Sequence, residues 1–207
     1  MPTASLCLIT PRVADPAAFR PLLDAALGAA RVDSVHLRLA VSDEHDARRI
    51  IQALGPVVQD RGAALIIDPP ADWREVARWG ADGVHVGDPD QLKEALQALK
   101  PDRIVGAGGL RSKDAAMGAG EAGVDYVMFG EPRADGTVPA AGQVTDRCQW
   151  WAEVFTTPCI GYAAGPDMVK PLAATGAEFV ALGEWLFSGS PEEAGERVRA
   201  AAEAVKG

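Results

Sequence analysis

The sequence predicts an α/β fold in which eight parallel strands, each followed by a helix, close into a single (β/α)8 barrel spanning residues 1–207. Short apolar runs alternate with segments of helical period from end to end. Parallel neighbours need a crossover helix between them, so eight such units indicate a parallel sheet. A doubly wound open sheet is the alternative, but no G-x-G-x-x-G follows the first run. The length alone also leaves two small domains open.

A repeated pattern ahead of the strands favours the closed barrel. It reads VDSV at 32–35, GADGV at 80–84, GVDYV at 123–127 and GAEFV at 176–180. In the last three, a glycine can take the left-handed helix cap, an acidic residue turns outward, and an apolar strand begins. The acidic residues at 33, 82, 125 and 178 recur about once per two β/α units, as expected of a barrel built from quarter-barrel pairs.

The individual elements follow from the same alternation. Apolar runs predict strands at Ser5–Thr10, Ser34–Leu39, Ala63–Ile67, Gly83–Val86, Arg103–Ala107, Tyr126–Phe129, Cys159–Gly161 and Phe179–Leu182. Helical periodicity predicts helices at Pro16–Ala30, Asp43–Gln59, Pro89–Lys100, Ser112–Ala122, Gly165–Ala174 and Pro191–Val205. Asp88 is a good N-cap because proline follows it at the first helical position.

The composition excludes several classes of partner. A net charge of -9 with only five lysines gives no basic stripe, so we expect neither nucleic acid nor a membrane surface as partner. No apolar run approaches the ~20 residues that span a bilayer. Cys7, Cys148 and Cys159 are odd in number, lack C-x-x-C spacing and follow no secretory signal. This pattern predicts a cytoplasmic protein without disulfides or a zinc site.

Several segments resemble one known family in order along the chain. They are LCLIT at 6–10, VHLRLA at 35–40, LIID at 65–68, GADGVHVGDPD at 80–90, GVDYVMFGEP at 123–132 and GAEFVALGEWLFSGSPEEA at 176–194. The chain is similar to thiamine-phosphate synthase and the related TenI proteins. The resemblance implies a TIM barrel that, in active relatives, joins hydroxymethylpyrimidine diphosphate to a thiazole phosphate with Mg²⁺ and releases pyrophosphate.

The family's magnesium ligands are only half present. The family's fourth-strand motif ends in an aspartate that binds magnesium, and Asp90 falls on it. The second magnesium aspartate, after the third strand, is replaced by Pro69, and the arginine that follows it by Pro70. Asp68 lies one residue earlier, which directs its side chain to the opposite face of the strand. The resemblance implies Mg²⁺ as cofactor, whereas these losses argue against it.

The family's phosphate-binding groups have changed as well. Its second-strand glutamine, arginine and lysine become His36, Arg38 and Ala40. We expect His36 and Arg38 to share the strand face toward the barrel interior, where a charged group needs an anion or a carboxylate as partner. The histidine that TenI-type tautomerases use aligns with Leu110. Arg133 and Thr137 are only loose counterparts of the family's sixth-strand-loop lysine and threonine.

The last strands bring a carboxylate where the family binds phosphate. Its glycine-rich loop after the seventh strand becomes alanine at 163 and 164, and Glu184 and Trp185 follow the eighth strand. A carboxylate 4 Å from a phosphate charge costs about 4 kcal/mol at an effective dielectric constant of 20. Trp185 stands at a strand end of the active face, where it could stack on a planar ligand. We therefore predict that Arg38 is neutralised from within, by Asp68, Asp90 or Glu184.

Two hypotheses follow for the function. The first is a thiamine-phosphate synthase-type transferase of thiamine biosynthesis with a degenerate or remodelled site. The alternative is a non-catalytic barrel that binds a small heterocyclic ligand or a protein partner. Candidate ligand-binding residues are His36, Arg38, Asp68, Glu184 and Trp185, with Asp90 as the candidate metal ligand. His85 is interpreted as a hydrogen-bonded core residue, and the sequence leaves homo-oligomerisation open.

Overall fold

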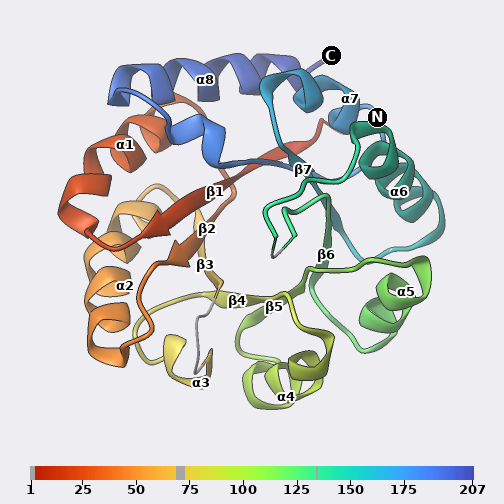
Figure 1. Cartoon of the computed structure of the whole chain (residues 1–207), viewed down its shortest axis with the longest axis horizontal. Helices are drawn as coiled ribbons and strands as arrows, with labels where there is room; N and C mark the ends of the chain where they lie inside the picture. Colours follow the sequence, from red (N-terminus) through yellow and green to blue (C-terminus); the bar gives the residue numbers. More distant parts are fainter. Residues whose placement is uncertain (1–2, 69–72, 134) are drawn as a thin grey trace.

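The chain forms a closed barrel of eight parallel strands in sequence order, surrounded by helices (Figure 1). The computed structural model describes residues 3–68, 73–133 and 135–207. The strands are β1 (Ser5–Val13), β2 (Ser34–Leu39), β3 (Ala64–Asp68), β4 (Gly83–Val86), β5 (Ile104–Ala107), β6 (Tyr126–Phe129), β7 (Cys159–Ala163) and β8 (Phe179–Leu182). The predicted fold class is confirmed.

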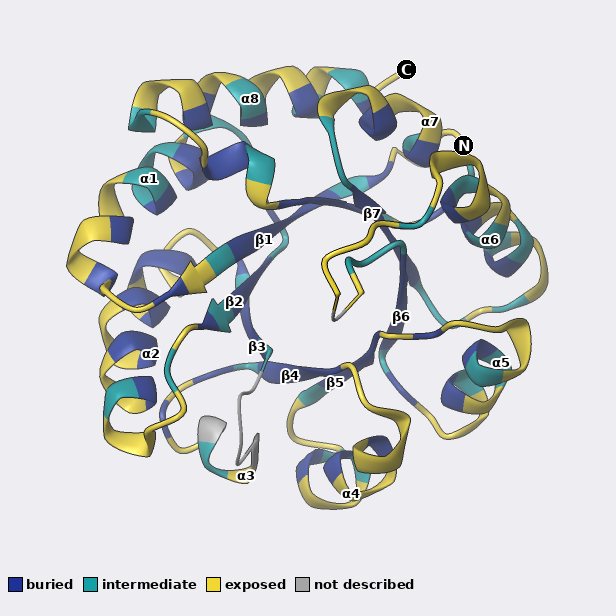
Figure 2. Ribbon diagram, in the orientation of Figure 1, coloured by how far each residue is buried: buried dark blue, intermediate teal, exposed yellow. Residues whose placement is uncertain are grey.

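The helices lie outside the strands. They are α1 (Pro16–Ala29), α2 (Glu44–Gln59), α3 (Trp73–Val76), α4 (Pro89–Leu99), α5 (Lys113–Glu121), α6 (Ala141–Val154), α7 (Val169–Ala173) and α8 (Pro191–Ala204), with 3-10 turns η1 (Pro166–Met168) and η2 (Glu184–Phe187). Apolar residues fill the layer between helices and strands, so that the strands are buried on both faces (Figure 2). None of the helices in the described part of the chain is long and apolar enough to cross a membrane.

The helical predictions fail in three places. The helix predicted over Gly165–Ala174 is divided into η1 and α7. Helices α3 and α6 were not predicted from periodicity, and α6 gives little signal because Ala140 at its N-cap makes no side-chain hydrogen bond. The N-cap at Asp88 is confirmed, since its carboxylate accepts a hydrogen bond from the Asp90 amide at 3.0 Å.

Strand β1 runs further than its apolar pattern predicts. It continues through Pro11 to Val13, with a shift in its pairing with β2 between Ile9 and Arg12. Proline cannot donate to the ladder, so its position at a bulge is the expected one. The extension matters for the site because it brings Arg12 to the barrel opening, where its guanidinium donates to the Leu39 carbonyl.

The repeated acidic residues fasten pairs of strands at the amino end of the barrel. Asp82 accepts a hydrogen bond from the Leu65 amide at 2.7 Å, Asp125 from Val105 at 2.8 Å, and Glu178 from Cys159 at 2.9 Å. Each carboxylate thus precedes one strand and binds the start of the strand before it. The sequence pattern predicts only that these residues turn outward, and the contact of each carboxylate with an amide of the preceding strand was not predicted. Their glycine partners at 80, 123 and 176 have φ values of 102°, 90° and 89°, as predicted for the left-handed cap.

Candidate functional site

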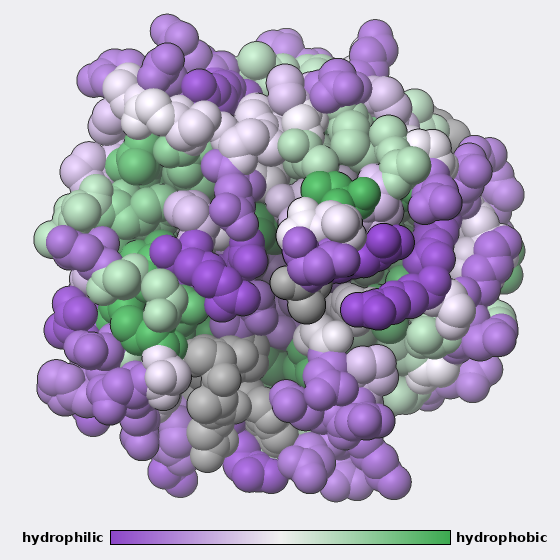
Figure 3. Space-filling model, viewed as in Figure 1, coloured by the Kyte–Doolittle hydropathy of each residue, from purple (hydrophilic) through white to green (hydrophobic). Residues whose placement is uncertain are grey.

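A cavity of about 1020 Å³ opens at the carboxyl ends of the strands. Its walls come from the ends of β1 to β4, β6 and β7, from the segments after β5, β6 and β8, and from α6. Polar side chains gather over this face of the molecule (Figure 3). Ligands of such barrels bind at this end, because loops there can vary without disturbing the barrel. The cavity is therefore the candidate functional site.

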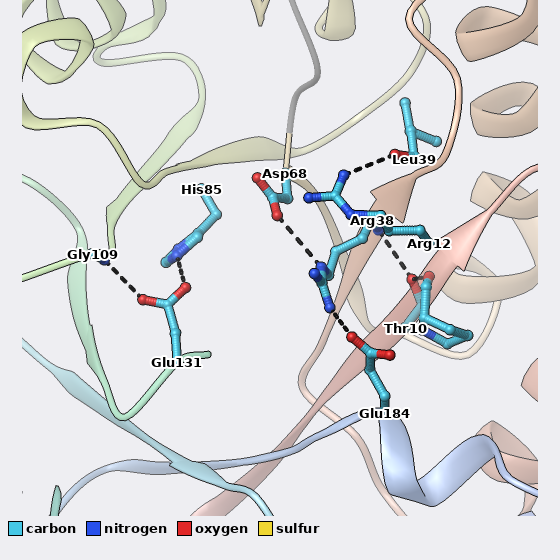
Figure 4. A network of polar contacts seen from close by, with 10 residues as sticks. Thr10, Arg12, Arg38, Leu39, Asp68, His85, Gly109, Glu131 and Glu184 are labelled. Carbon is cyan, nitrogen blue, oxygen red and sulfur yellow. Dashed lines mark hydrogen bonds and ion pairs between the residues drawn. The ribbon is translucent and has the colours of Figure 1, made fainter. Parts of the chain in front are cut away.

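Arg38 reaches into this cavity from β2 and is held by two carboxylates (Figure 4). Its Nε lies 3.6 Å from Oδ2 of Asp68, and its Nη1 donates to Oε1 of Glu184. The Arg38 side chain is only 18% exposed, whereas those of Asp68 and Glu184 are 39% and 48% exposed. The predicted internal neutralisation of Arg38 is confirmed for Asp68 and Glu184. The third candidate, Asp90, is exposed on α4 and does not line the cavity.

Asp68 faces the site directly. It is the register partner of Arg38 in the pairing of β2 with β3, so the two side chains leave the same face of adjacent strands. The expectation that its displacement by one residue would turn it to the opposite face is therefore wrong. Burial raises the pKa of Asp68, and the nearby charge of Glu131 acts in the same direction, while His85 and Arg38 oppose it.

A second charged pair lies deeper in the cavity and was not predicted as a pair. His85 of β4 places Nε2 2.7 Å from Oε1 of Glu131 and Nδ1 3.0 Å from the Tyr126 hydroxyl. The other oxygen of Glu131 accepts a hydrogen bond from the Gly109 amide at 3.0 Å. His85 is thus a hydrogen-bonded core histidine, as interpreted from the sequence. Glu131 was missed, although an acidic residue directly after β6 was the available signal.

Gly108 makes room for this pair. A Cβ on Gly108 would collide with Nε2 of His85 and with the Glu131 carboxylate. The glycine after β5 is therefore part of the site, because it lets a carboxylate from the next loop approach a buried imidazole. No such role was visible in the sequence, since Gly108 and Glu131 belong to different loops.

The electrostatics of the pair are reciprocal. Burial alone would lower the pKa of His85, but the charge and hydrogen bond of Glu131 outweigh it, and the pKa is raised from 6.5. Burial would raise the pKa of Glu131, but His85 and the Gly109 amide outweigh it, and the pKa is lowered from 4.5. Each group thus holds the other in its charged form.

This pairing predicts a pH dependence of stability. The raised pKa of His85 gives a contribution that is complete below about pH 6.5 and is lost as pH rises through its folded-state pKa. The lowered pKa of Glu131 gives one that is complete above about pH 4.5 and is lost as pH falls through its folded-state pKa. We expect Glu131→Gln to lower the free energy of unfolding by about 2 kcal/mol near pH 6, and by less at pH 9. Urea unfolding at both pH values measures the difference, and an equal loss at both would contradict the ion pair.

His36 lies beside this pair on the same face of β2 as Arg38, as predicted. Its ring centroid is 5.3 Å from that of His85 and 5.7 Å from that of Tyr126. Burial and the neighbouring charge of His85 lower the pKa of His36 well below 6.5, so the ring is neutral. Its Nε2 is the one buried side-chain nitrogen or oxygen, among the residues that the structure describes, without a hydrogen-bond partner.

The remaining candidates stand at the rim of the cavity. The Trp185 indole donates to the Ala163 carbonyl at 2.8 Å, which fixes the ring at the edge of the cavity. Leu110 also lines the cavity, and its carbonyl accepts a hydrogen bond from Arg147 at 2.7 Å. Arg133 donates to Thr137 at 3.4 Å.

The metal prediction rests on fewer residues than the family motif requires. Pro69 and Pro70 lie outside the described residues. Across the described ranges, no group of three or more histidine, cysteine, aspartate or glutamate side chains is arranged to hold a metal ion. Asp90 sits in the exposed first turn of α4, where it complements the helix dipole. Mg²⁺ is usually bound through one or two carboxylates together with substrate phosphates and water, so Asp90 as metal ligand stays a prediction.

Comparisons with known proteins agree along the chain. A family model described as thiamine monophosphate synthase matches residues 6–186. The chain is 38% identical to the thiamine-phosphate synthase of Rhodospirillum centenum, covering 94% of this chain and 95% of the relative. It is 36% identical to that of Hyphomonas neptunium, with 93% and 91% covered. Thiamine phosphate pyrophosphorylase from Pyrococcus furiosus has a similar fold, with a TM-score of 0.78 at 21% identity, covering 98% of this chain and 95% of that one.

Proposed function

The chain belongs to the thiamine monophosphate synthase family, and we propose that it is a thiamine-biosynthesis barrel with a remodelled site, in which coupling is slow or absent. Its cavity retains the place of the family's ligands but not the groups that would hold a diphosphate and a metal. The protein binds a small molecule in this cavity.

The observation that supports the proposal best is the double neutralisation of Arg38. A guanidinium in a barrel opening attracts a diphosphate only while its hydrogen-bond donors are available. Here Nε and Nη1 of Arg38 already face the carboxylates of Asp68 and Glu184. A diphosphate would have to displace both carboxylates, and each carboxylate left within 4 Å of a phosphate charge would cost about 4 kcal/mol at an effective dielectric constant of 20.

A role for Mg²⁺ in the reaction also lacks support from the described side chains. In active relatives the resemblance implies that Mg²⁺ offsets the charge of the departing pyrophosphate. Asp68 and Glu184 pair with Arg38, and Glu131 pairs with His85, so these three carboxylates of the cavity already have cationic partners. Our proposal therefore assigns no step to Mg²⁺.

Two other functions remain as alternatives. Coupling at an ordinary rate is supported by the names and identity of the curated relatives. A non-catalytic barrel that serves a protein partner is the other. The size of the cavity favours a small-molecule role over a protein partner, because 1020 Å³ lies at the upper end of what small-ligand sites occupy.

A direct assay distinguishes slow from ordinary coupling. The purified protein is supplied with hydroxymethylpyrimidine diphosphate, thiazole phosphate and Mg²⁺, and thiamine phosphate and pyrophosphate are measured by chromatography. We expect a kcat far below about 1 per second, the lower end of ordinary enzymes. The Rhodospirillum centenum relative, assayed in parallel, is the positive control. Turnover of this protein at a rate comparable with that control would refute the remodelled site.

A further inference from the structure

The deep part of the cavity, here called the floor, contains carboxylates of the chain itself. Glu184 and Asp68 occupy the donors of Arg38, and Glu131 occupies those of His85 and of the Gly109 amide. These are two separate clusters on different strands, and in each a carboxylate of the chain binds the donors that a phosphate would use. With His85 protonated, the groups from Arg12, Arg38 and His85 balance three carboxylates in formal charge. The floor is therefore neutral in formal charge, and a phosphate ester bound there would lie beside three carboxylates of the chain.

One polar group at the floor is nevertheless unused. His36 is 2% exposed, lines the cavity, and leaves Nε2 without a hydrogen bond to any residue in the described ranges. A buried polar atom without a partner is costly, and in native proteins most such atoms bind another group of the protein or an ordered water, so Nε2 is the natural contact point for a ligand in this cavity. Because the His36 ring is neutral, it offers a hydrogen bond without offering a charge.

The rim differs from the floor in charge. Arg111, Arg133 and Arg147 lie on or beside the loops after β5 and β6. Arg147 is engaged by the carbonyls of Leu110 and Arg111, and Arg133 by Thr137. The positive charge of this cavity therefore lies at the rim, away from His36 at the floor.

From these observations, and resting on the proposed function, we propose that the ligand is an uncharged, phosphate-free heteroaromatic molecule that forms a hydrogen bond with His36 at the cavity floor. Tyr162 and Trp185 line the same cavity and provide flat apolar surfaces for a planar ring. The built-in carboxylates exclude the phosphate esters of the same ring. The site thus prefers an uncharged ligand to an anionic one, whereas a diphosphate site prefers the anion.

Binding of matched pairs of probes tests the selection. Hydroxymethylpyrimidine and hydroxyethylthiazole are each titrated beside their phosphate esters by calorimetry, without Mg²⁺. We expect at least one alcohol to bind, and to bind at least tenfold more tightly than its own ester. An ester that binds as tightly as its alcohol would overturn the inference and assign the rim arginines as an anion site. Binding of neither alcohol would overturn it as well.

A charge variant with a matched control locates the selectivity. Glu184→Gln removes one carboxylate beside Arg38 and should narrow the preference for the alcohol at least threefold. Glu203→Gln changes the net charge equally on the exposed end of α8 and should leave the preference unchanged. An equal effect of both would show that the overall charge, and not the floor, sets the selection.

The His36 contact is tested by separating binding from stability. His36→Leu replaces an unpartnered polar ring by an apolar side chain, so we expect an unchanged or higher midpoint of thermal unfolding together with loss of alcohol binding. His36→Gln keeps a hydrogen-bonding group, so its affinity for the alcohol should stay within about tenfold of the unchanged protein, the effect of about one hydrogen bond. Retained binding in His36→Leu would refute the contact. These outcomes can be distinguished from that of the coupling assay. Fast coupling refutes the proposed function. Tight binding of an ester without coupling refutes only this inference.

Discussion

A Gly108→Ala variant is expected to lose about 3 kcal/mol of its free energy of unfolding. The added Cβ cannot coexist with the observed positions of His85 and Glu131. The glutamate can turn toward the opening, but the buried imidazole cannot, so the pair breaks and His85 is left without its counter-ion. Overpacking contributes about 1–3 kcal/mol and the lost charged hydrogen bond a similar amount, with partial relaxation.

A matched glycine provides the control for this result. Gly118 lies inside α5, and a Cβ there would meet nothing within 4 Å. Gly118→Ala should be neutral or stabilise by up to about 1 kcal/mol, because alanine loses less backbone entropy in a helix. Urea unfolding of the three proteins at pH 6 measures both effects. A loss below about 1 kcal/mol in Gly108→Ala would mean that the His85–Glu131 pair contributes little to the fold.

Arg38→Ala is expected to lower the free energy of unfolding by about 2 kcal/mol at pH 7. Removing one partner of a fully buried ion pair costs about 3–5 kcal/mol, but Asp68 and Glu184 are 39% and 48% exposed, and water reduces the effect. The variant removes the cation that pairs with both carboxylates. Without Arg38, the pKa of Asp68 rises further above its ordinary value. A raised pKa of Asp68 means that stability is lost as pH rises and this carboxyl loses its proton. The loss of stability caused by Arg38→Ala should therefore be smaller at pH 4 than at pH 7.

An exposed arginine is the control for Arg38. Arg49 pairs with Asp46 on the surface of α2, and both side chains are about half exposed. Arg49→Ala should cost less than about 0.5 kcal/mol, as surface pairs usually do. Thermal and urea unfolding of both variants provide the measurement. An Arg38→Ala protein as stable as Arg49→Ala would show that the internal pair is not coupled to folding.

The sequence allowed the barrel and the partners of Arg38 to be predicted, for identifiable reasons. Strand and helix periods are local, so eight alternations were visible without any knowledge of contacts. Asp68 and Glu184 stood at strand ends, and the carboxyl ends of the strands of a barrel converge on one opening. Their convergence on Arg38 therefore followed from the fold.

The rest of the site depends on contacts that no local pattern encodes. Glu131 reaches His85 across 46 positions of the chain, and only Gly108, from a third segment, permits the approach. Arg12 arrives through a bulge at Pro11, where the apolar pattern had already ended. The unpartnered Nε2 of His36 is a property of its surroundings, and its residue type alone could not reveal it.

The acidic residues that bind the starts of β3, β5 and β7 have a consequence for how such a protein evolves. Asp82, Asp125 and Glu178 secure the barrel at the end remote from the cavity. Substitutions at the opening therefore leave these attachments intact, and the scaffold tolerates changes in the residues that line the cavity. A lineage can lose one ligand and acquire another through a series of foldable intermediates, because natural selection on the fold and on the ligand acts on opposite ends of the same strands.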